Sequence, residues 1–170
     1  MGHPEFERLT AHDAAVALRS FSRRFREAVR PDEVDGSGID AAATPPGTDR
    51  SPLEVVAGTT GLLRRRTRAV ERILAEPPGR LDADDLPGGA PPTGFDRPSG
   101  LTEALDELDV AVETLAGLAV RTPLPRWERT VEVGGVTVRA DELLRDAVSI
   151  GRQGVDTFVG ALQAARAAAS

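Results

Sequence analysis

The sequence predicts an all-α protein, a four-helix bundle with one small β-hairpin before its last helix. In four separate segments, apolar residues recur at spacings of three and four, which is the period of one helical face. Each apolar stripe needs another helix to cover it, so four stripes together favour a bundle. Before the fourth segment, apolar and polar residues alternate on both sides of Gly134-Gly135, a pattern typical of a hairpin.

The first helix is predicted over residues 10–29. Thr10 is a suitable N-cap, and Asp13 follows three residues later, as in a capping box. Pro31 stops the helix, and residues 31–50 are predicted to be a long loop rich in Gly, Pro, Asp and Ala. The apolar stripe of this helix comprises Ala14, Leu18, Phe21, Phe25 and Val29.

The second helix has the clearest start in the chain. Ser51-Pro52-Leu53-Glu54 places a capping serine before a proline at the first helical position and a glutamate at the third. Pro77-Pro78-Gly79 ends the helix, and residues 77–100 follow as a loop without periodicity. A loop this long is typical of a lid, an insertion or local disorder. The stripe comprises Leu53, Val56, Thr60, Leu63, Thr67, Val70 and Leu74.

The third and fourth helices are predicted over residues 101–118 and 141–168, with the hairpin at 127–139 between them. The third helix carries acidic residues on the faces away from its stripe. The whole chain is expected to form one domain, residues 1–170, because this length is usual for a single core. The two stripes comprise Leu101, Leu105, Leu108, Val112 and Leu115, then Leu144, Val148, Gly151, Val155, Phe158 and Leu162.

The composition excludes several kinds of chemistry. There is no cysteine, which excludes disulfides, thiolate metal sites and cysteine nucleophiles. There is no lysine, which excludes a Schiff base on that residue, and the abundance of arginine and alanine indicates a GC-rich bacterial genome. The N-terminus lacks the apolar region of a signal peptide, and no apolar run is long enough to cross a membrane, so a cytoplasmic location is expected.

The net charge of −6 argues against nucleic-acid binding, which needs a basic surface. Arg64-Arg65-Arg66 is a local exception. On a helix this run spreads around the circumference, so we expect a solvated face whose arginines pair with the acidic third helix.

Few residues are suited to catalysis. His3 and His12 are the only histidines, too few for a histidine-rich zinc site, and His12 is expected to be exposed. No Gly-x-Ser-x-Gly elbow or phosphate-binding loop is present. Helices two and four do carry polar or small residues on or beside their stripes. This predicts a satisfied hydrogen-bond network or simple solvent-facing positions, which is the favoured interpretation, or else the lining of a pocket. These residues are Gly58, Thr59, Thr60, Ser149, Gln153 and Asp156.

The order of motifs resembles the DinB-like superfamily, including the N-terminal domains of mycothiol-dependent maleylpyruvate isomerases. The resemblance lies in the capped run Ser51–Gly58, then Trp127 and the Gly-Gly hairpin, then the run Ala140–Val148. It implies an up-down-down-up bundle that holds a divalent metal between helices two and four. The family's ligands, a histidine on helix two and a Glu or His followed four residues later by a His on helix four, fall at Gly58, Ser149 and Gln153. These residues are poor ligands for zinc or nickel, so no metal and no cofactor is expected.

Three hypotheses for function follow. The first is a metal-free DinB-like protein that binds a small molecule or a partner protein in the pocket of the bundle. The second is a thiol-dependent isomerase or transferase of the mycothiol type, in which Arg152 and Asp156 near Gln153 would activate the thiol and burial would make Asp156 a base. The third is an interaction module that forms a homodimer. The first is favoured, because it needs only an apolar pocket with a few polar groups.

Overall fold

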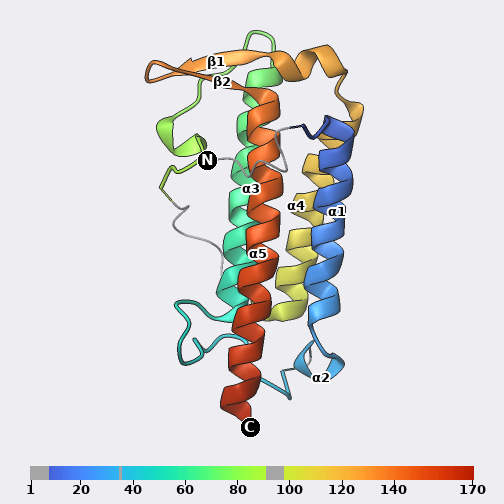
Figure 1. The fold of residues 1–170 in the computed structure, drawn as a ribbon, viewed down its shortest axis with the longest axis vertical. Coiled ribbons are helices and arrows are strands. Elements are labelled where there is room, and N and C mark those ends of the chain that lie inside the picture. Colours follow the sequence, from blue (N-terminus) through green and yellow to red (C-terminus); the bar gives the residue numbers. More distant parts are fainter. Residues whose placement is uncertain (1–7, 35, 91–97) are drawn as a thin grey trace.

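The structure is a computed structural model that describes residues 8–34, 36–90 and 98–170. Within these ranges the chain is mostly helical, with five α-helices and a two-stranded antiparallel hairpin directly before the last of them (Figure 1). The α-helices are α1 (Ala11–Ala28), α2 (Pro31–Val34), α3 (Pro52–Leu74), α4 (Leu101–Arg121) and α5 (Ala140–Ala169). The remaining elements are the 3-10 helices η2 (Ala83–Asp85) and η3 (Leu124–Glu128) and the strands β1 (Thr130–Val133) and β2 (Val136–Arg139).

The four long helices, α1, α3, α4 and α5, lie side by side along the molecule (Figure 1). α3 packs against α4 and α5, and α1 packs against the same two helices. Their apolar stripes meet in one core, in which the rings of Phe25 and Phe158 lie 5.1 Å apart between centroids. The long helices predicted from the stripes are therefore confirmed, although α4 extends to Arg121, beyond the predicted end at residue 118.

Both predicted capping boxes are confirmed. The backbone N–H of Asp13 donates to Thr10 Oγ1 at 3.1 Å, and the backbone N–H of Thr10 donates to the Asp13 carboxylate at the same distance. At the start of α3, the N–H of Glu54 donates to Ser51 Oγ at 3.1 Å, and the N–H of Ser51 donates to Glu54 Oε2 at 2.9 Å. Each box satisfies backbone donors that the first helical turn leaves without a partner.

The expectation of an unbroken loop over residues 31–50 is wrong, because α2 occupies its start. Pro31 does not only follow the end of α1; it also supplies the first residue of α2, where its missing N–H costs nothing. Glu33 on α2 is 2% exposed and accepts hydrogen bonds from Arg166 near the end of α5, at 2.6 and 2.8 Å. Arg166 also donates to the carbonyl of Ala28 at 2.7 Å, so α2 joins the end of α1 to α5.

The arginine run at 64–66 does not lie entirely on a solvated face. Arg64 pairs with Glu107 of α4 at 3.2 Å, as expected, but Arg66 is buried. Its Nε donates to Asp146 Oδ2 on α5 at 2.6 Å, and its other nitrogens donate to the carbonyls of Asp85 and Leu86 at 2.6 and 3.1 Å. Burial is tolerated because these partners satisfy the guanidinium.

The same contacts correct the description of residues 77–100 as a structureless loop. η2 lies within it, and Arg65 and Arg66 hold residues 84–90 against α3 through backbone carbonyls. Leu81 is also buried in the core. Residues 91–97 of this loop lie outside the described residues. A lid formed by this part of the chain therefore stays a prediction.

The predicted hairpin is confirmed, but it begins at Thr130 and not at Trp127, because η3 extends to Glu128. Thr130 pairs with Arg139 and Val133 with Val136, and Gly134 and Gly135 form the turn at φ values of 58° and 83°. Positive φ at both central positions is the conformation of a type I′ turn, which glycine adopts without strain. No helix in the part of the chain that the structure describes is long and apolar enough to cross a membrane.

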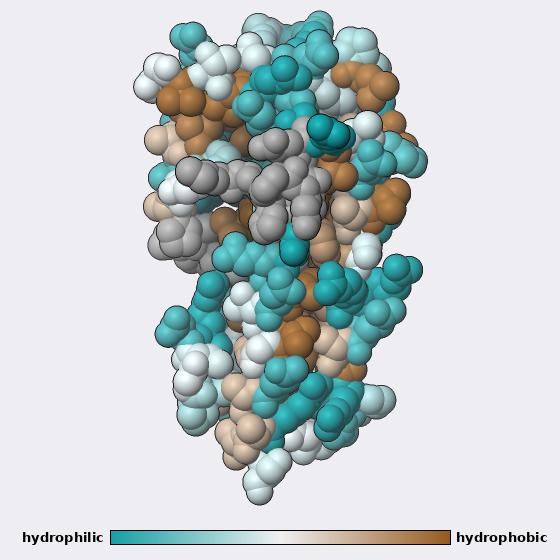
Figure 2. Space-filling model, in the orientation of Figure 1, coloured by the Kyte–Doolittle hydropathy of each residue, from teal (hydrophilic) through white to brown (hydrophobic). Residues whose placement is uncertain are grey.

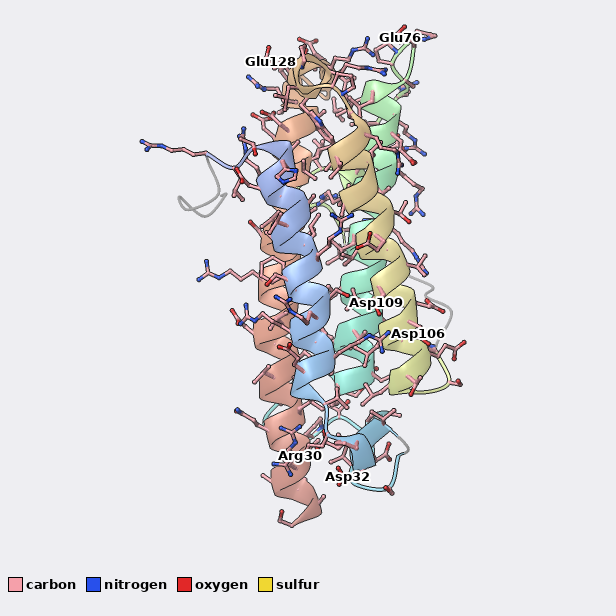
Figure 3. All side chains as sticks on the ribbon, turned by 90° about the vertical axis from the view of Figure 1, so that its right-hand side faces the viewer. Arg30, Asp32, Glu76, Asp106, Asp109 and Glu128 are labelled. Atoms are coloured by element: carbon pink, nitrogen blue, oxygen red, sulfur yellow. The ribbon has the colours of Figure 1, made fainter. Side chains whose placement is uncertain are left out.

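Acidic α4 is joined to α1 by ion pairs on the outer surface. Arg26 of α1 donates to Asp106 Oδ1 at 2.5 Å and to Asp109 Oδ2 through Nε at 2.7 Å. Both carboxylates extend from α4 toward α1 (Figure 3), and Ser22 also donates to Asp109. Arg19 of α1 forms a further ion pair, at 2.8 Å, with Glu113, which lies one helical turn after Asp109 on α4.

Candidate groove between α3 and α5

A groove of about 150 Å³ lies between α3 and α5. The two helices run in opposite directions, and α5 lies in front of α3 as viewed in Figure 1. In the same orientation, the visible face of the molecule carries hydrophobic residues between hydrophilic ones along the middle of its lower half (Figure 2). The groove is lined by Arg50, Val55, Thr59, Leu62, Ile150, Gln153, Gly154 and Thr157.

Helical periodicity explains why these residues face one another. On α3, Val55, Thr59 and Leu62 follow the spacing of four and three that places side chains on one face. On α5, the lining residues between 150 and 157 follow the same rule. Gly154 lies on the core face of α5, one turn before the buried Phe158, whereas Gln153 and Thr157 are exposed. The groove therefore runs from the contact between the two helices to the outer surface.

Gly154 forms the floor of the groove and allows the two helices to approach closely. A Cβ at this position would lie 2.6 Å from Thr59 Oγ1 and 2.9 Å from Thr59 Cγ2, and 3.1 Å from Phe25 Cζ. Such distances are shorter than ordinary van der Waals contacts, so α3 and α5 can pack this closely only because residue 154 has no side chain.

Arg50 lies at the mouth of the groove, next to Gly58. One nitrogen of its guanidinium would lie 3.4 Å from a Cβ placed on Gly58, so the arginine lies over the surface that this glycine leaves bare. Arg50 precedes the N-cap Ser51 and reaches back along α3 toward Gly58. None of the ion pairs found among the described residues includes Arg50.

The polar groups of the groove come from both helices. Thr59 is buried, and its hydroxyl donates to the carbonyl of Val55 at 2.8 Å, which leaves its oxygen able to accept a hydrogen bond. Gln153 and Thr157 are exposed side chains on the opposite wall. With Arg50, the groove therefore offers one cation and several neutral donors and acceptors beside apolar walls.

The structure separates the residues that the sequence grouped together. Thr59 and Gln153 line the groove, and Gly58 borders it beneath Arg50. Thr60 is buried and its hydroxyl donates to the carbonyl of Val56 at 3.0 Å, so it belongs to a satisfied local hydrogen bond. The residues that do not line the groove are Ser149, Arg152 and Asp156.

The position of Asp156 does not support the acid–base role suggested for it. Asp156 is exposed, so burial, the physical cause that would have made it a base, is not found. Ser149 directs its hydroxyl toward the carbonyl of Arg145 at 3.4 Å, one turn earlier on its own helix. His12 is exposed, as expected, and His3 lies outside the described residues.

The residues at the positions implied by the family do not fit a divalent metal. Gly58 has no ligand atom, and the cationic Arg50 lies over it, where a second cation would be repelled. Ser149 does not line the groove, and an amide such as Gln153 alone is a poor ligand. Elsewhere in residues 8–34, 36–90 and 98–170, no cluster of three or more His, Asp or Glu side chains is arranged to hold a metal ion.

Several lining residues could not have been selected from the sequence. Leu62 and Ile150 look like core positions, and Arg50 precedes a helix that it then folds against. One available signal was Gly154, because a glycine inside a helix destabilises it and is usually there for a packing or functional reason.

Two other hollows lie on the described surface. One, of about 610 Å³, lies beside α4 and includes Arg64, Asp106 and Glu107, two of which form the pair described above. Ser99 and Gly100 line it and lie close in the chain to residues 91–97, which are not described, so we assign no site to it. The other, of about 230 Å³, lies between residues 40–46 and the end of α5, and its one carboxylate, Asp40, accepts hydrogen bonds from the backbone of Ala42 and Ala43.

Comparisons of the sequence with protein-family models, with curated proteins and with solved structures found no match. The resemblance to the DinB-like superfamily therefore rests on the sequence motifs alone.

Proposed function

We propose that this chain is a metal-free, DinB-like four-helix bundle that binds a small organic molecule in the groove between α3 and α5. The observation that carries the proposal is the combination of apolar walls with Arg50 and Thr59 in one recess. Binding sites for small molecules are typically concave and mostly apolar, with a few polar groups that fix the orientation of the ligand.

The interpretation as a DinB-like bundle is supported by the arrangement of the long helices. α1 and α5 run downward in the view of Figure 1, whereas α3 and α4 run upward, in agreement with an up-down-down-up order. The groove also lies between the two helices that the resemblance implies for the ligand site. It opens on the outer surface, however, so its position differs from that of a metal site inside the bundle.

The size of the groove limits the ligand. A volume of about 150 Å³ holds roughly five water molecules at ~30 Å³ each. Drug-sized ligands usually take sites of about 300–1,000 Å³. The groove therefore suits a small metabolite, or one end of a larger molecule that extends past the exposed Gln153 and Thr157.

The alternative, a thiol-dependent isomerase or transferase, has less support. Such an enzyme needs a group that removes a proton from the thiol. None of the lining residues is a carboxylate or a histidine, and Asp156 is exposed outside the groove. Binding without proton transfer is the function that these side chains can perform.

The proposal can be tested with a fragment screen by thermal shift and saturation-transfer NMR. Gln153→Trp places a bulky ring at the wall of the groove on an exposed position, and Gln163→Trp makes the same change on the same helix away from it. We expect fragments that bind the unmodified protein and Gln163→Trp to lose binding to Gln153→Trp. Equal binding to all three proteins would contradict the proposal.

The absence of a metal is tested separately by elemental analysis of the purified protein, together with thermal shifts in zinc, nickel and manganese. We expect no copurified metal and no rise in melting temperature. Near-stoichiometric metal would show that the assignment of Gly58, Ser149 and Gln153 to the family's ligand positions is wrong. The homodimer hypothesis is tested by light scattering, where a monomer would exclude it.

A further inference from the structure

We infer that the ligand of the α3–α5 groove is a small organic monocarboxylate with a short apolar chain, whose carboxylate pairs with Arg50. This inference rests on the proposed function and specifies its ligand class. It is carried by the charge, the walls and the size of the groove.

The charge of the lining indicates a single negative charge on the ligand. Arg50 is the one charged residue among those that line the groove, and it forms none of the ion pairs found in the described residues. A guanidinium presents parallel N–H groups that match the two oxygens of a carboxylate. A phosphate dianion would keep an uncompensated charge beside Val55 and Ile150, which disfavours it.

The walls of the groove indicate a short hydrocarbon group. Val55 and Leu62 from α3 and Ile150 from α5 supply its apolar surface. A volume equal to roughly five water molecules accommodates a chain of about four or five non-hydrogen atoms in addition to an exposed carboxylate. Burial of such a chain is favourable by the hydrophobic effect.

The neutral polar groups add selectivity. The Thr59 hydroxyl gives its proton to the carbonyl of Val55, so toward a ligand it acts as an acceptor. It therefore favours a hydroxyl or amide N–H on the chain and not a second carboxylate. Among small acids, those with one hydrogen-bond donor on the apolar chain are expected to bind more tightly than the plain chain.

The test is an NMR titration with matched probes. Butyrate and butyramide have the same shape and differ in charge, and inorganic phosphate tests the alternative anion. The variants are Arg50→Gln and its control Arg68→Gln, which removes the same charge from an exposed position on α3 outside the groove. Thermal denaturation verifies that each variant is folded.

We expect butyrate to bind at least tenfold more tightly than butyramide, and Arg50→Gln to weaken butyrate binding about tenfold, as loss of a charge-assisted hydrogen bond predicts. Arg68→Gln should change it less than twofold. Equal affinity for the acid and the amide, tighter binding of phosphate, or no effect of Arg50→Gln would overturn the inference. If one of these results is found and neutral fragments still fail to bind Gln153→Trp, only the ligand class is wrong and the proposed function is retained. If no probe and no fragment responds to Gln153→Trp, both are wrong.

Discussion

Gly154 of α5 lies against Thr59 of α3 so closely that a methyl group on the glycine would be 2.6 Å from the threonine oxygen. This contact sets the distance between the two helices and so the depth of the groove that they form. The contact also fixes the Thr59 hydroxyl at the floor of the groove, where it is buried and bonded to Val55.

Gly154→Ala is expected to destabilise the protein by about 1–3 kcal/mol, the usual effect of overpacking a well-packed contact. Gly160→Ala is the matched control, because a Cβ there meets no atom within 4 Å and the position is exposed on the same helix. The control should stabilise by about 0.5–1 kcal/mol, since alanine favours the helix. Urea unfolding of both variants measures the difference, and equal effects would show that the close contact is not real.

Arg66→Leu is expected to lower the free energy of unfolding by about 3 kcal/mol. This is near the lower limit for breaking a buried ion pair, because the partner Asp146 is partly exposed. It also removes the donors that hold the carbonyls of Asp85 and Leu86. Arg64→Leu, at the neighbouring position, removes an exposed pair and should cost less than about 1 kcal/mol. Denaturation compares the two, and limited proteolysis should cut residues 80–90 faster only in Arg66→Leu.

Stability at acidic pH should depend on Glu33. The hydrogen bonds from Arg166 lower the pKa of this carboxyl below its ordinary value of 4.5, against the opposing effect of burial. A lowered pKa in the folded state means that the stabilisation is complete above pH 4.5 and is lost as the pH falls through the lowered pKa. Glu33→Gln should cost about 1–3 kcal/mol at pH 7 and flatten the acid dependence of unfolding.

Glu113→Gln serves as the control for this pH dependence. Arg19 also lowers the pKa of Glu113, but both side chains are largely exposed. Its loss should therefore change stability by less than about 1 kcal/mol. An equally steep acid dependence in Glu33→Gln and in the unmodified protein would show that α2 is not held by this pair.

The cap of α3 should be worth more than its exposed counterpart on α1. Ser51 is completely buried, whereas Thr10 is exposed, although both complete capping boxes. Ser51→Ala is expected to cost about 2 kcal/mol and Thr10→Ala about 0.5–1 kcal/mol, the two ends of the range for N-cap residues. Thermal and urea unfolding measure both, and equal losses would contradict the importance of burial here.

The sequence was sufficient for the elements that depend on local rules. The capping boxes at Thr10 and Ser51 and the turn at Gly134-Gly135 follow from short-range backbone chemistry, and the structure has them where they were expected. The burial of Arg66 was not predictable, because its partners lie far along the chain, on α5 and in the loop after α3.

The groove was only partly predictable for the same reason. Thr59 and Gln153 could be selected from the sequence because they are polar residues near apolar stripes. Periodicity alone, however, does not determine which neighbouring helix the polar residues of α5 face. Arg50 enters the groove because its side chain extends along the first turns of α3 as far as Gly58, a contact that helical periodicity does not predict.

The most direct test of the groove is a two-dimensional ¹H–¹⁵N NMR map of amide shifts on titration with the best fragment from the screen. We expect the largest shifts at Val55, Gly58, Thr59, Gln153 and Gly154, on both walls of the groove. Shifts concentrated instead at Thr102, Glu103 and Val110, beside the larger hollow at α4, would contradict it.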